Sequence, residues 1–243
     1  MNDEPSVLVS TEGHLGRLML NRPRAINALT HEMVGLLSEA LDAWRDDESV
    51  RTVLLTGAGD RGLCAGGDIV SLFHDARADR TEGPAFWRDE YLLDNLIAEY
   101  PKPVVAVMDG LVLGGGIGVS AHASHRVVTE RSSIGMPEVG IGFVPDVGGA
   151  WLLAHAPGEI GTHLALTAGS VGPDDAVAIG MADHVVPSDR VPALTEALAH
   201  GDVDGAIASV AVAPGPSALL DDRDWIDAAY AGDDLIRIVQ RLD

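Results

Sequence analysis

Residues 101–123 read PKPVVAVMDGLVLGGGIGVSAHA, an apolar run followed by a turn and a cluster of glycines. Two prolines frame the start of a buried strand that we predict over Val104–Met108. Asp109-Gly110 then forms a turn, and the glycine cluster begins a helix that continues to about Ala123. A strand that leads through a glycine-rich turn into a helix is a unit typical of α/β proteins.

The rest of the chain alternates between strand and helix patterns. Further short strands are expected at Ser6–Ser10, Gly16–Leu20, Val50–Thr56, Arg126–Thr129, Ser133–Gly135 and Asp183–Val186. Helices are expected from an N-cap at Thr30 to Arg45 and over Ile69–Ala78, Gly148–His155, Ile160–Thr167 and Val191–Leu198, and an acidic, amphipathic stretch is expected over Pro84–Tyr100. This alternation predicts an α/β domain with short parallel or mixed sheets.

The C-terminal part has a different composition. The stretch Gly201–Pro216 is built from few residue types, which predicts a mobile linker. A final acidic helix is predicted over Trp225–Leu242. We therefore expect one main domain, residues 1–198, followed by a linker and a short helical tail, residues 199–243.

Charge limits the range of partners. The 243 residues include 16 Lys and Arg against 37 Asp and Glu, a net charge of −21. A field of this sign repels phosphate backbones and anionic headgroups, so neither nucleic acid nor a membrane surface is expected as a partner. A small anionic ligand can still bind through a local group of Arg side chains or backbone N–H groups.

Cysteine and histidine usage excludes two kinds of site. Cys64 is the single cysteine, so there is no disulfide framework, and a small buried side chain is its expected role. His122 and His125 lack a third ligand at a telling distance, so no metal site is predicted. The N-terminal residues show no signal pattern and the longest weakly polar run, Leu111–Ala123, is too short to span a bilayer, which predicts a cytoplasmic protein.

Two glycine-bearing turns are candidates for binding a negatively charged oxygen. One is Cys64-Ala65-Gly66-Gly67-Asp68, between a strand and a helix, and the other is Gly114-Gly115-Gly116, at the start of a helix. A carbonyl that is attacked or deprotonated develops negative charge, which fixed backbone N–H groups stabilise. Either turn alone could equally serve close packing.

A third segment, residues 136–149, carries two carboxylates in apolar surroundings. It reads MPEVGIGFVPDVGG, with Glu138 and Asp146 separated by glycines, a proline and apolar side chains. Desolvation raises the pKa of a carboxyl group and suits it to acid–base or nucleophilic work. The alternatives are a helix N-cap for Asp146 and a surface loop position for Glu138.

Taken together, these motifs resemble a known family. The run LNRPRAINALT from residue 20, the CAGGD turn, the strand–GGG–helix unit and the MPE…PDVGG loop occur in the order and approximate spacing of the crotonase (enoyl-CoA hydratase/isomerase) superfamily. The resemblance implies a crotonase-like spiral of ββα units with the active site between two sheet layers. It also implies that the amides of Gly67 and Gly115 form an oxyanion hole for an acyl-CoA thioester.

By the same resemblance, the acyl-CoA substrate lies along two segments of the chain. Its CoA part would contact Arg24, Ala25 and Ile26, with Arg24 facing the phosphates. The turns would add Ala65, Gly66, Asp68 and Gly114 to this site. Coenzyme A is then part of the substrate and no separate cofactor is expected, and a homo-oligomer based on a trimer is implied.

The finer resemblance is to the 3-hydroxyisobutyryl-CoA hydrolase branch, which acts in valine breakdown. Family hydratases carry one glutamate at the position of Gly118 and another at that of Glu138, and only the second is present here. Carried over, Glu138 would attack the thioester or activate water, and Asp146 would bind the 3-hydroxyl group.

Two features depart from this branch. His74 stands near the place of an acidic residue that contacts substrate, and the branch continues with further helices after its core. An enoyl-CoA isomerase or hydratase is therefore an alternative function. A non-catalytic acyl-CoA binder is a second alternative.

Overall fold

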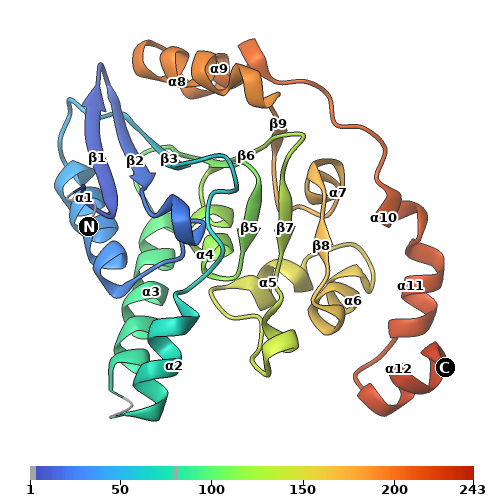
Figure 1. The fold of residues 1–243 in the computed structure, drawn as a ribbon. Helices are drawn as coiled ribbons and strands as arrows, with labels where there is room; N and C mark the ends of the chain where they lie inside the picture. Colours follow the sequence, from blue (N-terminus) through green and yellow to red (C-terminus); the bar gives the residue numbers. More distant parts are fainter. Residues whose placement is uncertain (1–3, 79–80) are drawn as a thin grey trace.

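The computed structural model describes residues 4–78 and 81–243, in which two β-sheets are surrounded by helices (Figure 1). The large sheet has six strands in the order β1-β2-β3-β4-β6-β9. Only the β1–β2 pair is antiparallel, and every other neighbouring pair in this sheet is parallel. Its strands are β1 (Val7–Glu12), β2 (Leu15–Leu20), β3 (Thr52–Gly57), β4 (Val104–Met108), β6 (His125–Val128) and β9 (His184–Val185).

A smaller sheet of three strands lies beside the large one (Figure 1). It consists of β5 (Leu111–Leu113), β7 (Ser133–Gly135) and β8 (Ser170–Val171), with β5 parallel and β8 antiparallel to β7. β7 and the mixed α/β class are confirmed predictions. Both β5 and β8 were missed, because two or three residues are too few to show an alternating pattern.

Helices cover both sheets. Their bounds are α1 (His31–Arg45), α2 (Ile69–Arg77), α3 (Glu82–Ala98), α4 (Gly115–Ala121), α5 (Gly149–Ala154), α6 (Ile160–Thr167), α7 (Pro173–Ala178), α8 (Val191–His200), α9 (Val203–Val210), α10 (Ala218–Asp221), α11 (Arg223–Tyr230) and α12 (Leu235–Leu242). Three 3-10 turns are η1 (Pro23–Ala25), η2 (Glu138–Ile141) and η3 (Ser188–Arg190). The predicted cap of α1 is confirmed, because the Thr30 hydroxyl accepts the Met33 amide at 3.2 Å.

The large sheet has a hydrophobic core on each face. Successive side chains of a strand point to opposite faces, so Val105 and Val107 of β4 join a cluster with α8 and α9. Ala106 and Met108 face the other way, into the larger cluster that includes residues of α1, α3 and α4. β4 is therefore buried on both faces, which explains its uninterrupted apolar sequence.

The mobile linker predicted over Gly201–Pro216 is wrong for its first half. Residues Val203–Val210 form α9, which Asp202 caps by accepting the Gly205 amide at 2.8 Å. Val203, Ala206, Ile207 and Val210 are buried, and their spacing is that of one helical face. Gly205, a poor helix former, and the small number of residue types in the segment hid this pattern.

The single C-terminal helix predicted over Trp225–Leu242 is also wrong. The segment forms two helices, α11 and α12, which are separated at Gly232, a residue with φ of +81°. Asp234 then caps α12 by accepting the amides of Ile236 and Arg237. A glycine in the left-handed region followed by a capping aspartate ends one helix and begins the next.

One carboxylate joins α2 to α3. Asp75, near the end of α2, accepts the amides of Thr81, Glu82 and Gly83 at 2.9 to 3.1 Å. These amides belong to the first turn of α3, where backbone N–H groups lack partners within the helix. At the other end of α2, Asp68 caps the helix by accepting the Ser71 amide.

Candidate active site

The two glycine-bearing turns lie side by side, although about 45 residues separate them in sequence. β5 places them together: Cys64 forms a parallel bridge with Val112, and the Leu113 amide donates to the Cys64 carbonyl at 3.0 Å. The second turn therefore follows directly after a strand that runs beside the first. Because the sequence analysis missed β5, it could not explain this contact.

The amides of Gly67 and Gly115 meet at this junction. A Cβ atom placed on Gly115 would lie 3.3 Å from the Gly67 nitrogen, and one on Gly66 would lie 3.6 Å from the Gly115 nitrogen. Among the described residues, neither amide has a hydrogen-bond acceptor. Two unpaired N–H groups in one place form a site where a carbonyl oxygen can be held.

Glu138 lies next to this junction. Its side chain extends from η2 toward Gly114, where an added Cβ atom would overlap the Glu138 Oε1 atom. The residue is 8% exposed and Oε2 has no partner, so the surface-loop alternative is wrong. Burial, helped by the charge of Asp146, raises the pKa of Glu138 to about 7.

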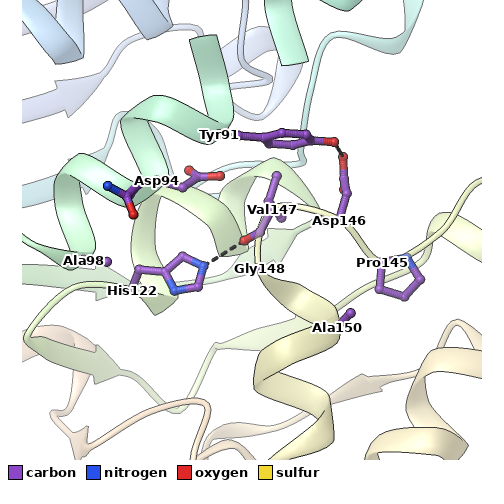
Figure 2. Close-up of a pocket in the computed structure, with 10 residues that line it drawn as sticks. Tyr91, Asp94, Ala98, His122, Pro145, Asp146, Val147, Gly148 and Ala150 are labelled. Carbon is purple, nitrogen blue, oxygen red and sulfur yellow. Dashed lines mark hydrogen bonds between the residues drawn. The ribbon is translucent and has the colours of Figure 1, made fainter. Parts of the chain in front are cut away.

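Asp146 is held by a tyrosine from α3. The Tyr91 hydroxyl donates to Asp146 Oδ2 at 2.7 Å, as Figure 2 shows. Burial raises the pKa of Asp146, although this hydrogen bond acts in the opposite direction. The N-cap alternative is wrong, because Gly148 occupies the cap of α5 and no side chain bonds there.

Helix α3 contributes two further carboxyl groups that the sequence analysis missed. Glu90 is 2% exposed and Asp94 is 5% exposed. Glu90 Oε1 and both Asp94 oxygens lack a hydrogen-bond partner within the described residues. Burial raises the pKa of Glu90 to about 8, with smaller contributions from the charges of Asp146 and Glu138. Burial, together with the charge of Glu90, raises the pKa of Asp94 well above its ordinary value.

The helix pattern of α3 contains a signal for these groups. Phe86, Glu90, Leu93, Asp94 and Ile97 are all buried and fall on one helical face. Two acids on the apolar face of an amphipathic helix are unusual, since buried carboxyl groups cost free energy. The prediction described the stretch only as acidic and amphipathic, and so did not separate its inner acids from its outer ones.

The comparisons with known proteins agree with this geometry. The sequence profile described as enoyl-CoA hydratase/isomerase matches residues 15–243. The chain belongs to this family. The resemblance to the crotonase superfamily and the fold class are thereby confirmed.

Curated relatives within the family are named as hydrolases. The mitochondrial 3-hydroxyisobutyryl-CoA hydrolase of Danio rerio is 40% identical over 192 residues, which are 79% of this chain and 50% of that protein. The Homo sapiens protein of the same name is 38% identical over the same share of each chain. The chain thus spans half the length of these relatives.

Solved structures within the family carry other names. A carnitinyl-CoA dehydratase from Mycobacterium thermoresistibile has a TM-score of 0.96 and 53% identity, and the match covers 98% of this chain and 70% of that one. An enoyl-CoA hydratase from Rhodobacter sphaeroides has a TM-score of 0.92 and 44% identity, covering 98% and 69%. Family membership leaves the choice between hydrolysis and hydration to the site itself.

The position that carries a second glutamate in family hydratases has no room for a side chain here. A Cβ atom on Gly118 would lie 2.8 Å from both carboxylate oxygens of Asp94 and from Cβ of Val147. Such contacts are closer than carbon and oxygen atoms tolerate. The glycine therefore lets α3 and the Asp146 turn approach α4.

The segment that the family resemblance assigns to CoA lies at the surface. Arg24 and Ala25 are exposed in η1, and the Arg61 guanidinium donates to the Arg24 carbonyl at 2.7 Å. Ile26 follows in a left-handed conformation with φ of +48°. The guanidinium groups of Arg24 and Arg61 thus both lie at one exposed segment. The predicted contact of Arg24 with the CoA phosphates stays a prediction.

The other residues in and around the predicted CoA site differ in their burial and in the partners of their side chains. Asp68 is paired with Arg22 at 2.9 Å as well as capping α2, which favours a structural role for both side chains. His74 is exposed on α2, with its ring edge against Phe73, and its substrate contact stays a prediction. Cys64 is buried, and burial raises the pKa of its thiol to about 12, which disfavours a thiolate nucleophile.

A cavity of about 460 Å³ adjoins Asp146 (Figure 2). Its lining residues come from α3, the end of α4 and the turn before α5; they are Tyr91, Asp94, Asn95, Ala98, His122, Pro145, Asp146, Val147, Gly148 and Ala150.

Within the described residues, no helix combines the length and the apolar character that crossing a bilayer requires.

Proposed function

We propose that this chain hydrolyses the thioester of a short 3-hydroxyacyl-CoA. One observation supports the proposal above all: Glu138, a buried carboxyl with a pKa of about 7, lies beside the paired amides of Gly67 and Gly115. A carboxyl with this pKa is substantially ionised at neutral pH and is still basic enough to take a proton from water.

The reaction begins with the thioester oxygen between the two amides. Attack on the carbonyl carbon turns that oxygen into an oxyanion, which the N–H groups of Gly67 and Gly115 stabilise. The attacking atom comes either from Glu138 itself, through an anhydride, or from a water that Glu138 deprotonates. Collapse of the adduct breaks the C–S bond and releases CoA, whose thiolate takes up a proton. In the water route the free hydroxy acid leaves directly, whereas in the anhydride route a water then hydrolyses the anhydride, which frees the acid and restores the Glu138 carboxylate.

In this proposal Asp146 binds the acyl group of the substrate. It is fixed by Tyr91 and lies close enough to Glu138 for the two charges to affect one another. As a hydrogen-bond acceptor it suits a substrate hydroxyl group, in agreement with the names of the hydrolase relatives. Glu90 lies next to Gly115, and its raised pKa keeps it largely neutral at pH 7, so it adds little charge against the oxyanion.

The test is a thiol-release assay with product masses. Purified chain is given 3-hydroxyisobutyryl-CoA, 3-hydroxybutyryl-CoA and crotonyl-CoA, and free CoA is followed over time. We expect CoA release with the hydroxyacyl substrates and its loss in Glu138→Gln, while Glu130→Gln, an exposed glutamate that accepts from Ser188, retains it. The absence of CoA release above background from every substrate would overturn the proposal.

A second candidate is reversible dehydration of the same substrates. The observation that favours it is the presence of additional carboxyl groups from α3 at the site, together with solved relatives named as a dehydratase and a hydratase. The same assay detects it as an enoyl-CoA of unchanged thioester content, differing from the substrate by one water. An enoyl-CoA isomerase would shift the double bond at constant mass, and a non-catalytic binder would leave every thioester unchanged.

A further inference from the structure

His122 contacts the turn that carries Asp146. It follows directly after α4, and its Nε2 atom lies 2.7 Å from the Val147 carbonyl oxygen (Figure 2). A carbonyl can only accept, so Nε2 carries the proton and donates it. The imidazole thereby joins the end of α4 to the residue after Asp146.

The backbone at this contact has an unusual conformation. Val147 has φ of +46° and Gly148 has φ of +74°, two successive left-handed residues. A β-branched residue rarely adopts this conformation and keeps it only where the surroundings hold it. At Gly148 an added Cβ atom would overlap the His122 ring, so glycine is needed for the close approach as well as for the backbone conformation.

Helix α4 holds the side chain of Val147 in addition to its carbonyl group. Gly118 lies one turn before His122 on the same face of the helix, and its Cβ position would be 2.8 Å from Cβ of Val147. Val147 is 3% exposed. Gly115, whose amide belongs to the oxyanion site, is the first residue of the same helix. One short helix thus supports the oxyanion site at one end and the Asp146 turn at the other.

We propose that His122 is a positioning residue, which holds the strained turn at Val147 and so fixes the carboxyl of Asp146 relative to the amide of Gly115. The catalytic consequence rests on the proposed function, and the structural consequence does not. His125 has no share in this role, since its ring contacts Ser124 at 3.0 Å and Asp204 at 3.6 Å.

The experiment compares His122→Leu with His122→Gln. Leucine removes the donor, whereas the Gln amide nitrogen can replace Nε2. In hydrogen exchange followed by mass spectrometry, we expect the amides of residues 146–149 to exchange about tenfold faster in His122→Leu, as for a loss of one well-placed hydrogen bond. We expect kcat for thioester release to fall about tenfold, because the carboxylate of Asp146 is displaced. We expect KM to change less than about threefold, because the contacts to the CoA part of the substrate remain. His122→Gln restores both values to within about threefold of the wild type.

His155→Leu is the matched control. His155 Nδ1 bonds the Trp151 carbonyl at 2.8 Å, a histidine–carbonyl contact that does not involve the Asp146 turn. Wild-type exchange over residues 146–149 in His122→Leu, or equal acceleration in His155→Leu, would overturn the proposal. So would a failure of His122→Gln to differ from His122→Leu. If the wild-type protein releases no CoA, the proposed function fails, while the exchange measurement still decides the role of His122.

Discussion

The loop over residues 136–149 and helix α3 both bring carboxyl groups to the site, but they hold them in different ways. The loop carboxyl of Glu138 is buried, that of Asp146 is half-buried, and Asp146 has a partner in Tyr91. The helix carboxyls of Glu90 and Asp94 are more deeply buried, and at least one oxygen of each has no partner.

This difference separates a reactive role from a supporting one. A pKa of about 7 lets Glu138 exchange a proton at neutral pH, whereas the pKa of Glu90, about 8, keeps that group largely protonated there, and burial raises the pKa of Asp94 well above its ordinary value. The same fold therefore places ionised and neutral carboxyl groups a few side chains apart. Burial, more than mutual repulsion, produces the difference, since desolvation is the largest cause of each shift.

The largest expected effect distinguishes the two regions directly. Glu138→Gln removes the group that attacks or activates water, and we expect kcat to fall by about a hundredfold to ten-thousandfold. Asp94→Asn keeps the size of a side chain that has no role in the proposed reaction, and we expect a change below about fivefold. The rate of CoA release at saturating substrate concentration measures both effects. Equal losses in the two variants would show that the division is wrong.

The pH profile of kcat gives the next effect. Glu138 acts as the carboxylate, so the rate should rise with pH and level off above its pKa of about 7. At one pH unit below that value, about a tenth of the plateau rate is expected. A limb centred near the ordinary pKa of a glutamate would mean that Glu138 is not desolvated when it acts. Glu130→Gln should leave this limb unchanged.

Removing the Tyr91 hydroxyl should have a moderate effect. Tyr91→Phe leaves the ring in place and deletes the 2.7 Å hydrogen bond to Asp146. The lost bond to a charged acceptor is worth about 1.5–3 kcal/mol in general, but Tyr91 is partly exposed and water can replace it, so we expect about a fivefold loss of kcat/KM for hydroxyacyl-CoA. An equal loss with a substrate that lacks the hydroxyl group would contradict the assignment of Asp146 to that group.

The smallest effect concerns stability. The pKa of Glu90 is raised in the folded chain from the ordinary 4.5 to about 8, so folding binds its proton more tightly. Its contribution is therefore fully present below about pH 4.5 and is lost as pH rises through about 8. Glu90→Gln removes this dependence, and we expect a gain of a few degrees in Tm at pH 8.5 relative to the wild type, with less gain at pH 5.5. Glu99→Gln, on the exposed side of α3, should show no such difference.

Much of the fold could be predicted from the sequence, because its strands and longer helices have clear periodicity. Glu138, Asp146 and the two glycine turns were singled out from their Gly- and Pro-rich contexts, and the family resemblance supplied their expected roles. The structure places the two turns against one another with Glu138 beside them, and Asp146 lies near enough to affect the pKa of Glu138. Acids are conspicuous in such contexts, since apolar loops seldom carry them.

The parts that the sequence analysis missed depend on contacts between distant segments. β5 is recognisable only through its pairing with Cys64 and β7, and α9 only through its burial against the large sheet. Glu90 and Asp94 lie in a helix that carries exposed acids as well. Their place on the same helical face as Phe86, Leu93 and Ile97 was a readable signal, which the prediction of an acidic, amphipathic stretch did not use.

The hydrogen bonds of Asp75 connect the CAGGD turn, through α2, to helix α3 on the other side of the site. The CAGGD turn ends at the cap of α2, and Asp75 bonds α2 to the first turn of α3. Helix α3 in turn places Glu90 next to Gly115, one of the two residues proposed to bind the oxyanion. No residue of α2 is fully buried, although Leu72 packs partly against the core, so these end connections contribute to the orientation of the helix. A ligand that tilts α2 would consequently displace the amide of Gly67 and the acid beside Gly115 together. A substrate contact at α2 would in this way change the positions of both groups.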